Sequence, residues 1–131
     1  MRDKMDNLGK FGEEVASKYL KTKGYKIRER NYRTSLGEID IIGEYKSEII
    51  FVEVKTRSSE QFGLLEEAVN LSKQKKMIKN ALGYLTRYHL GKSNTRFDVI
   101  LISISDHRKV NSIKHIKNAF NLDFSSQKGL V

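Results

Sequence analysis

Charged side chains interrupt two apolar runs near the middle of the chain. Asp40 lies in the first run, residues 38–43, and Glu53 and Lys55 lie in the second, residues 48–55. A buried strand normally excludes such groups, because an unpaired charge in a protein interior is costly. Two carboxylates beside a lysine can bind a hard divalent cation and assist hydrolysis of a phosphodiester. These residues therefore predict either a metal-dependent hydrolytic site, which we favour, or a buried cluster of ion pairs.

The two runs have the pattern of a β-hairpin, and its register decides whether the charged groups meet. With a loop of four residues, Glu38 lies opposite Glu53, and Asp40 is a diagonal neighbour of Glu53. Side chains alternate between the faces of a strand, so one face would carry four charged residues: Glu38, Asp40, Glu53 and Lys55. A cation between the acids would offset their repulsion. A loop with an odd number of residues would put Asp40 on the other face and remove the site.

The composition is that of a small basic protein. The 131 residues include 25 Lys and Arg against 16 Asp and Glu, which gives a net charge of +9. This surplus suggests a polyanionic partner, most often nucleic acid, although charge alone also fits a soluble basic protein without one. The absence of Cys excludes disulfides and thiolate zinc sites. Without an apolar signal region or a membrane-length run, we expect a cytoplasmic protein and no membrane contact.

The densest basic segment is residues 18–33, where seven Lys and Arg face a single acid, Glu29. Tyr25 and Tyr32 are interleaved with them. Such a segment suits phosphate contact with some base stacking, although a solvated charged face is the commoner explanation. The nucleic-acid-binding residues predicted here are Lys26, Arg28, Arg30 and Arg33.

A helix is predicted from Asp6 or Asn7 to about Lys23, with Gly24 as its C-terminal stop. Glu13 leans toward the apolar stripe of this helix. It is either a site residue or an acid of the first turns that complements the helix dipole, and the sequence leaves both open.

The remaining pattern predicts further elements in one domain, residues 1–120, followed by a polar, flexible tail, residues 121–131. They are an edge strand over 25–32, a polar connection over 58–63, a short helix over 64–70, a helix from Ser72 to about His89 with Met77, Ile78, Ala81, Leu85 and Tyr88 facing the core, a strand over 95–105 and a last strand over 110–116. Asp98 is interpreted as a strand-entry charge paired with Arg96 or a lysine. The three His residues have no metal-ligand spacing.

Several segments in chain order carry a resemblance to known proteins: Gly12–Ala16, Gly37–Asp40, Phe51–Arg57, Ala68–Val69 with Lys73–Gln74, Arg96–Val99, and His115–Ile116 with Asn118–Phe120. Together they resemble the PD-(D/E)XK nuclease superfamily, and more narrowly the YraN family of small bacterial endonuclease-like proteins, which are similar to archaeal Holliday-junction resolvases. Ile39 stands where the superfamily motif has proline, a departure that resolvase-type members tolerate.

The resemblance implies an α/β fold with a restriction-endonuclease-like core, in which helices flank a mixed central sheet in the order α-β-β-β-α-β. It implies that Asp40 and Glu53 bind Mg²⁺ or Mn²⁺ and that Lys55 orients a water. Glu13 would hold a metal-bound water or a second ion. Lys73, Gln74 and Arg57 would contact nucleic acid.

The function expected from this resemblance is a metal-dependent endonuclease acting on DNA, including branched DNA. Two cuts in a junction would suit a homodimer. A nucleic-acid-binding module with a catalytically silent site is the main alternative. A basic RNA- or ribosome-associated protein is a third, and no RNA-recognition motif supports it.

Overall fold

The computed structural model describes residues 2–58, 69–105 and 108–120. In chain order the elements are α1 (Arg2–Thr22), β1 (Lys26–Thr34), β2 (Gly37–Tyr45), β3 (Glu48–Arg57), α3 (Leu71–Arg87), β4 (Asn94–Ile104) and β5 (Val110–Phe120). This order confirms the predicted α/β class and is consistent with a restriction-endonuclease-like core. Neither of the described helices combines the length and the apolar composition that a bilayer crossing requires.

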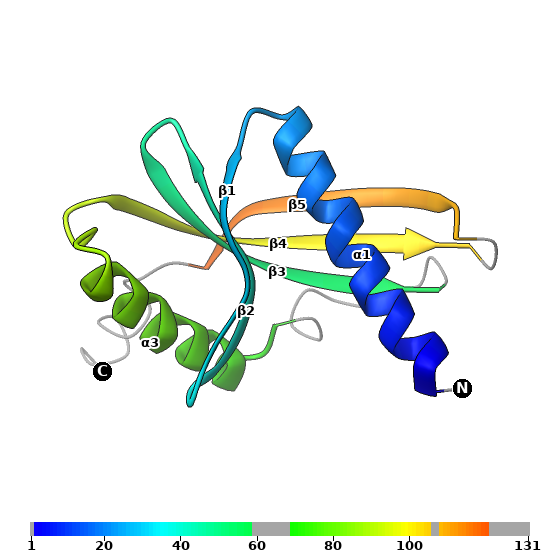
Figure 1. Ribbon diagram of the computed structural model, residues 1–131, viewed down its shortest axis with the longest axis horizontal. Coiled ribbons are helices and arrows are strands. Elements are labelled where there is room, and N and C mark those ends of the chain that lie inside the picture. The colour runs from blue at the N-terminus through cyan, green and yellow to red at the C-terminus, as the bar shows by residue number, and fades with distance from the viewer. Residues whose placement is uncertain (1, 59–68, 106–107, 121–131) are drawn as a thin grey trace.

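The five strands form one mixed sheet in the order β1-β2-β3-β4-β5. The central pair, β3 and β4, is parallel, and the other three pairs are antiparallel. A parallel pair needs a crossover connection, and α3 lies within it. Figure 1 shows β1 and β2 turning steeply across the other three strands, with α1 and α3 well apart on either side of them.

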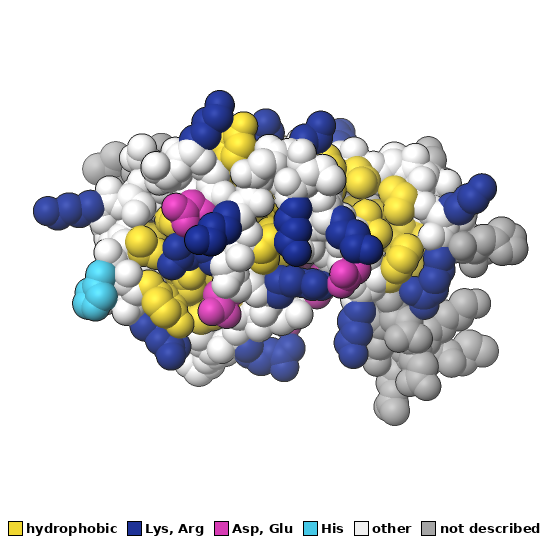
Figure 2. All heavy atoms as spheres, turned by 45° about the horizontal axis from the view of Figure 1, so that its top comes forward, with side chains coloured by type: hydrophobic (Ala, Val, Ile, Leu, Met, Phe, Trp, Pro, Cys, Tyr) yellow, Lys and Arg dark blue, Asp and Glu magenta, His cyan; other side chains and the backbone are white. Residues whose placement is uncertain are grey.

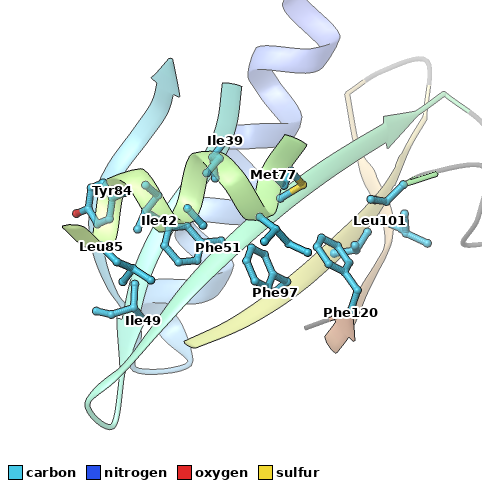
Figure 3. Close-up of a cluster of buried hydrophobic side chains, with 14 residues drawn as sticks. Ile39, Ile42, Ile49, Phe51, Met77, Tyr84, Leu85, Phe97, Leu101 and Phe120 are labelled. Carbon is cyan, nitrogen blue, oxygen red and sulfur yellow. The ribbon is translucent and has the colours of Figure 1, made fainter. Parts of the chain in front are cut away.

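A core on the α3 side of the sheet is built around aromatic rings. Phe97 of β4 stacks on Phe51 of β3 at a centroid distance of 5.4 Å and on Phe120 of β5 at 4.9 Å. Figure 3 shows these rings in a row beside Met77 of α3. Parallel stacked rings on adjacent strands bury large apolar area and so fix this part of the sheet.

A second core lies on the opposite face, under α1. Ala16 and Leu20 of α1 are completely buried there, against the apolar side chains of the central strands. Each face of the sheet is therefore covered by one described helix. This arrangement explains why β3 and β4 read as almost continuously apolar, because their residues are buried on both faces.

The predicted ends of α1 are half right. Gly24 has a φ of +95°, which ends the helix where the sequence indicated. The start is wrong, because the helix begins at Arg2 and not after Asp6 or Asn7. Propensity alone could not exclude the extra turn, since the residues before Asp6 tolerate helix well.

The predicted cap of α3 is also wrong. Asn70, not Ser72, is the N-cap, and its side-chain oxygen accepts a hydrogen bond from the Lys73 N–H at 2.9 Å. Tyr88, predicted to face the core, is 38% exposed because it lies at the C-cap, after the last helical turn. Tyr84, one turn earlier, is buried in its place. The other predicted core residues, Met77, Ile78, Ala81 and Leu85, are buried.

The strands lie where they were predicted, with shifted ends. β1 is an edge strand as expected but continues to Thr34, and β5 continues from Val110 to Phe120. The predicted connection over 58–63 and short helix over 64–70 fall mostly outside the described residues. The tail over 121–131 lies outside them entirely.

The predicted register of the central hairpin is wrong by two residues. Tyr45 pairs with Glu48, so the turn contains only Lys46 and Ser47. Both have left-handed φ angles, 49° and 69°, which a tight two-residue turn of this kind requires. The sequence lacks the Asn-Gly pair that is typical of such a turn. A shift by an even number of residues keeps each side chain on its predicted face only along an unbroken ladder, and Asp40 lies beyond the end of this one. The predicted sharing of a face therefore stays a prediction.

Candidate functional site

Asp40 lies where β2 separates from β3. The ladder between the two strands ends at the pair Ile41 and Val52. Beyond it, the Asp40 carboxylate accepts a hydrogen bond from the Val54 N–H at 2.7 Å, which takes the place of a ladder bond. Ile39 packs in the α3-side core although Ile41 packs in the α1-side core, so the alternation of β2 is broken here. Because of this break, Asp40 lies at the point where β2 and β3 separate.

Helix α1 brings Glu13 to the same place through an unusually close contact. Gly12 is buried, and a Cβ atom on it would lie 1.9 Å from Thr56 Oγ1 of β3. Only glycine permits this approach. Glu13, the next residue, is thereby held beside β2 and β3, where it lines the cleft with Asp40 and Glu53.

A cleft of about 280 Å³ gathers the predicted catalytic residues. It is lined by α1, β2 and β3 through Leu8, Gly9, Glu13, Asp40, Glu53, Val54, Lys55, Thr56 and Arg57. All four predicted catalytic residues, together with Arg57, therefore surround one space. Their roles in catalysis and metal binding stay predictions.

Three carboxylates lie close together near the point where β2 and β3 separate. Glu13, Glu38 and Asp40 each offer an oxygen within 4.8 Å of the others. The Asn31 side-chain amide donates to Glu13 Oε1 at 2.8 Å and to Glu38 Oε2 at 2.7 Å. Arg33 donates to Glu38 Oε1 at 2.9 Å. The predicted placement of Glu38 opposite Glu53 is wrong, because the two-residue turn moves it out of that register.

Asn31 was missed by sequence reasoning although it left a signal. It interrupts the predicted edge strand and has a left-handed φ of 54°, a conformation that asparagine adopts more readily than most residues. Its amide joins α1 to β2 through the two acids. A polar residue with turn preference inside a strand pattern could have been identified as a special position.

Glu53 is the most buried acid of the cleft, with a side chain only 4% exposed, and it has a lysine partner. Lys73 Nζ donates to Glu53 Oε2 from the first turn of α3. The resemblance implied nucleic-acid contact for Lys73, and its pairing with Glu53 was not predicted. The neighbouring Gln74 donates to the Val69 carbonyl at 3.1 Å.

The electrostatics of the cleft favour an added cation. Burial and the neighbouring Glu53 carboxylate raise the pKa of Asp40 to about 8, with a smaller contribution from Glu13. The Val54 N–H and Lys73 act in the opposite direction. Clustered carboxylates that repel one another are the hard oxygen ligands that Mg²⁺ and Mn²⁺ prefer. The residues present therefore fit a hard divalent cation.

The predicted basic segment of β1 does not form a single patch. Arg28 contacts Tyr84 of α3 at 2.8 Å and Glu44 at 3.1 Å, whereas Arg30 contacts Glu14 of α1 at 3.1 Å. A register shift between Ile27 and Glu29 rotates the strand between them. Figure 2 shows Lys and Arg side chains spread across one face of the molecule with acids among them. Phosphate contact by Lys26, Arg28, Arg30 and Arg33 stays a prediction.

Asp98 has a structural environment that confirms its predicted pairing with Arg96. Its carboxylate is fully buried and accepts two hydrogen bonds from Arg96, each 2.8 Å long. His115 Nε2 lies 2.7 Å from the same carboxylate, and the Asn118 N–H donates to it at 2.9 Å. Burial acts to raise the pKa of Asp98, but the hydrogen bonds from His115, Arg96 and Asn118 outweigh it and lower the pKa. The partnership with His115 was not predicted.

Comparison with known proteins identifies relatives along most of the chain. A family model described as "Uncharacterised protein family UPF0102" matches residues 12–102. A UPF0102 protein of Clostridioides difficile is 49% identical over 112 residues, which cover 86% of this chain and 95% of that protein. UPF0102 proteins of Caldanaerobacter subterraneus subsp. tengcongensis and Alkaliphilus oremlandii are 44% identical over 114 residues and 48% identical over 115. They cover 86% of this chain and 93% and 97% of their own lengths, respectively.

Proposed function

The chain belongs to the UPF0102 family, the YraN family of the sequence resemblance, and we propose that it is a metal-dependent endonuclease-like protein that binds nucleic acid. We propose that it hydrolyses phosphodiester bonds in DNA, including branched DNA. The relatives' names state no activity. The proposal therefore rests on the cleft.

One observation carries the proposal: acids from α1, β2 and β3 line a single cleft together with Lys55. The cleft lies where β2 and β3 separate, and backbone or side-chain donors orient the acids. The Val54 N–H orients Asp40, and Asn31 orients Glu13. Preorganised groups of this kind contribute to catalysis because they need no rearrangement during the reaction.

Asp40 and Glu53 are the ligands we propose for Mg²⁺ or Mn²⁺, with Glu13 beside them. When bound, such a cation lowers the pKa of a coordinated water and offsets the negative charge of the phosphate. Lys55 lines the same cleft, where its ammonium group can orient a water and stabilise negative charge that develops on the phosphate. Arg57 ends the same strand and lines the cleft, and we propose that it contacts the nucleic-acid backbone.

The proposal is tested by incubating linear, flapped and four-way DNA with the protein in Mg²⁺, Mn²⁺ or EDTA. Asp40→Asn and Glu53→Gln should each lower metal-dependent cleavage by roughly a hundredfold or more, while DNA binding is largely retained. Lys55→Ala should also stop cleavage, but without weakening metal binding, because an ammonium group is not a ligand. Glu14→Gln, which changes an exposed acid next to Glu13, is the matched control.

A binding module with a silent site is the second candidate. The ion pair between Glu53 and Lys73 favours this second candidate, because Lys73 already binds a carboxylate that we propose as a metal ligand. Metal-independent DNA binding without cleavage of any substrate would support this alternative. Cleavage that persists in Asp40→Asn would show that the catalytic site lies elsewhere. A clear preference for structured RNA over DNA would favour an RNA-associated role.

A further inference from the structure

We propose that Lys73 is a built-in counter-ion of the cleft, which leaves Glu53 when a divalent cation binds there and then contacts a phosphate of the nucleic acid. This proposal rests on the proposed function and concerns how metal binding and substrate binding are coupled at the same site.

The two members of this ion pair are unequally exposed. The Glu53 side chain is 4% exposed, whereas the Lys73 side chain is 39% exposed. A carboxylate buried this deeply needs a cationic or hydrogen-bonding partner, and Lys73 provides it. The ammonium group sits on a flexible stem that reaches solvent, so Lys73 is the member of the pair that can move.

The side chain of Lys73 lies between two cavities. Its ammonium group contacts Glu53, which lines the large cleft. Lys73 itself lines a smaller cavity of about 80 Å³ together with Leu36, Gly37, Glu38, Lys76, Met77 and Asn80. A rotation about the stem would therefore take the ammonium group away from Glu53 and leave it beside this smaller cavity.

The surroundings of Lys73 favour an anion once Glu53 has another partner. The first turn of α3 contains no acidic residue, and the positive end of the helix dipole lies there. Lys76, in the next turn, is exposed and lines the same smaller cavity. Glu38 is an acid that lines the same cavity, but its carboxylate already accepts hydrogen bonds from Asn31 and Arg33. It is therefore a weaker partner for an ammonium group released from Glu53. A phosphate oxygen would stabilise that group.

Competition between Lys73 and the metal can be measured without an activity assay, by titrating Mn²⁺ into the protein in a calorimeter. Lys73→Met removes the competing charge, so Mn²⁺ should bind roughly tenfold more tightly than to the wild type, a coupling of ordinary size. The metal-free variant should melt at a lower temperature because Glu53 loses its partner, and Mn²⁺ should raise its melting temperature more than that of the wild type. Lys76→Met is the matched control and should change neither the Mn²⁺ affinity nor the melting temperature.

The phosphate contact is tested by the salt dependence of DNA binding. In Mn²⁺, Lys73→Met should reduce the slope of log affinity against log salt by about one phosphate contact. In EDTA, where Lys73 stays with Glu53, the slopes of variant and wild type should agree. Equal slopes in Mn²⁺ would overturn the phosphate contact.

Other outcomes separate this proposal from the proposed function. If the wild type cleaves DNA but Lys73→Met binds Mn²⁺ no more tightly, only the counter-ion role fails. If the wild type binds neither Mn²⁺ nor DNA, both proposals fail. Should Lys73→Met not fold, Lys73→Arg replaces it. A guanidinium pairs more firmly with a carboxylate, so Mn²⁺ should bind this variant more weakly, and unchanged affinity would contradict the proposal.

Discussion

Asp40 is a carboxyl group that the fold makes reluctant to ionise. Its pKa rises from 3.8 to about 8, mainly because of burial and then because of Glu53. Between these two pH values the folded metal-free protein binds a proton that the unfolded chain does not. The stabilisation that the folded protein gains from this bound proton is complete below the unfolded-state pKa and is lost as pH rises through about 8.

The metal-free protein should therefore become less stable as the solution becomes alkaline. In EDTA we expect the free energy of unfolding to fall by on the order of 2 kcal/mol between about pH 6 and pH 8, because one pKa unit corresponds to about 1.4 kcal/mol. Asp40→Asn should flatten this dependence, since an amide does not titrate. Urea denaturation at each pH measures the effect, with Glu14→Gln as the control. The same slope in Asp40→Asn and in the wild type would contradict the assignment.

The charged residues of the site were found from sequence because charges are unusual inside apolar runs. Asp40 and Glu53 do line one cleft, although the turn length was wrong and the alternation of β2 is broken beside Asp40. The partners of these acids were beyond such reasoning. Lys73 reaches Glu53 across 20 positions, and Asn31 reaches Glu13 across 18. Contacts of this kind depend on how helices dock on the sheet, which the pattern of a single strand does not specify.

At the scale of elements, the position of α1 depends on the missing side chain of Gly12. Gly12→Ala should force the helix away from Thr56 and destabilise the fold by roughly 1–3 kcal/mol, the usual range for overpacking. Mn²⁺ affinity should fall as well, because Glu13 would move with the helix. Urea denaturation and calorimetry measure the two effects.

Gly83 provides the control for this substitution. It lies in the middle of α3, is exposed, and has no atom within 4 Å of an added Cβ. Gly83→Ala should stabilise the protein by roughly 0.4–1 kcal/mol, since alanine restricts the unfolded chain and favours helix. If both variants were equally stable, close contact between α1 and β3 would not be required.

The order and type of the main elements followed from periodicity and from stop signals such as Gly24. Their ends were less predictable. The four-residue loop was inferred because polar residues continue past Gly43, but Glu44 and Tyr45 remain in the strand, where Glu44 binds Arg28. Glu44 and Tyr45, which local composition assigned to a loop, thus have long-range partners: Arg28 for Glu44, and Tyr25, whose ring stacks on Tyr45 at a centroid distance of 4.4 Å.

At the scale of the whole molecule, the net charge of +9 should dominate binding to DNA. Affinity for duplex or four-way DNA should fall steeply as salt rises, because each phosphate contact releases a counter-ion. Replacing Lys26, Arg28 and Arg30 together by alanine should weaken binding and lower the salt slope. Fluorescence anisotropy over a series of salt concentrations gives both values.

The control removes the same charge from exposed positions elsewhere: Lys92, Lys109 and Lys117. If this triple variant weakens binding as much as the β1 variant, the contribution of β1 is only its charge. Binding that does not depend on salt would rule out phosphate contact as the main source of affinity.

Both outer strands carry features that hinder pairing with another chain. β1 has a register shift between Ile27 and Glu29, and Asn31 within it is left-handed. β5 contains the left-handed Asn118 next to Lys117, close to a second register shift opposite Phe97 and Val99. Kinks and charges of this kind interrupt the row of free amide and carbonyl groups that a foreign strand would need.

We therefore expect these features to hinder growth of the sheet from either side. Fibril formation by strand addition should be disfavoured even at high protein concentration, because an incoming strand would find few consecutive hydrogen-bonding sites. For the same reason, two copies that assembled into a symmetric pair would join through helices or turns and not by continuing the sheet. The left-handed Asn31, whose amide binds Glu13 and Glu38, thus also hinders the pairing of β1 with a second molecule.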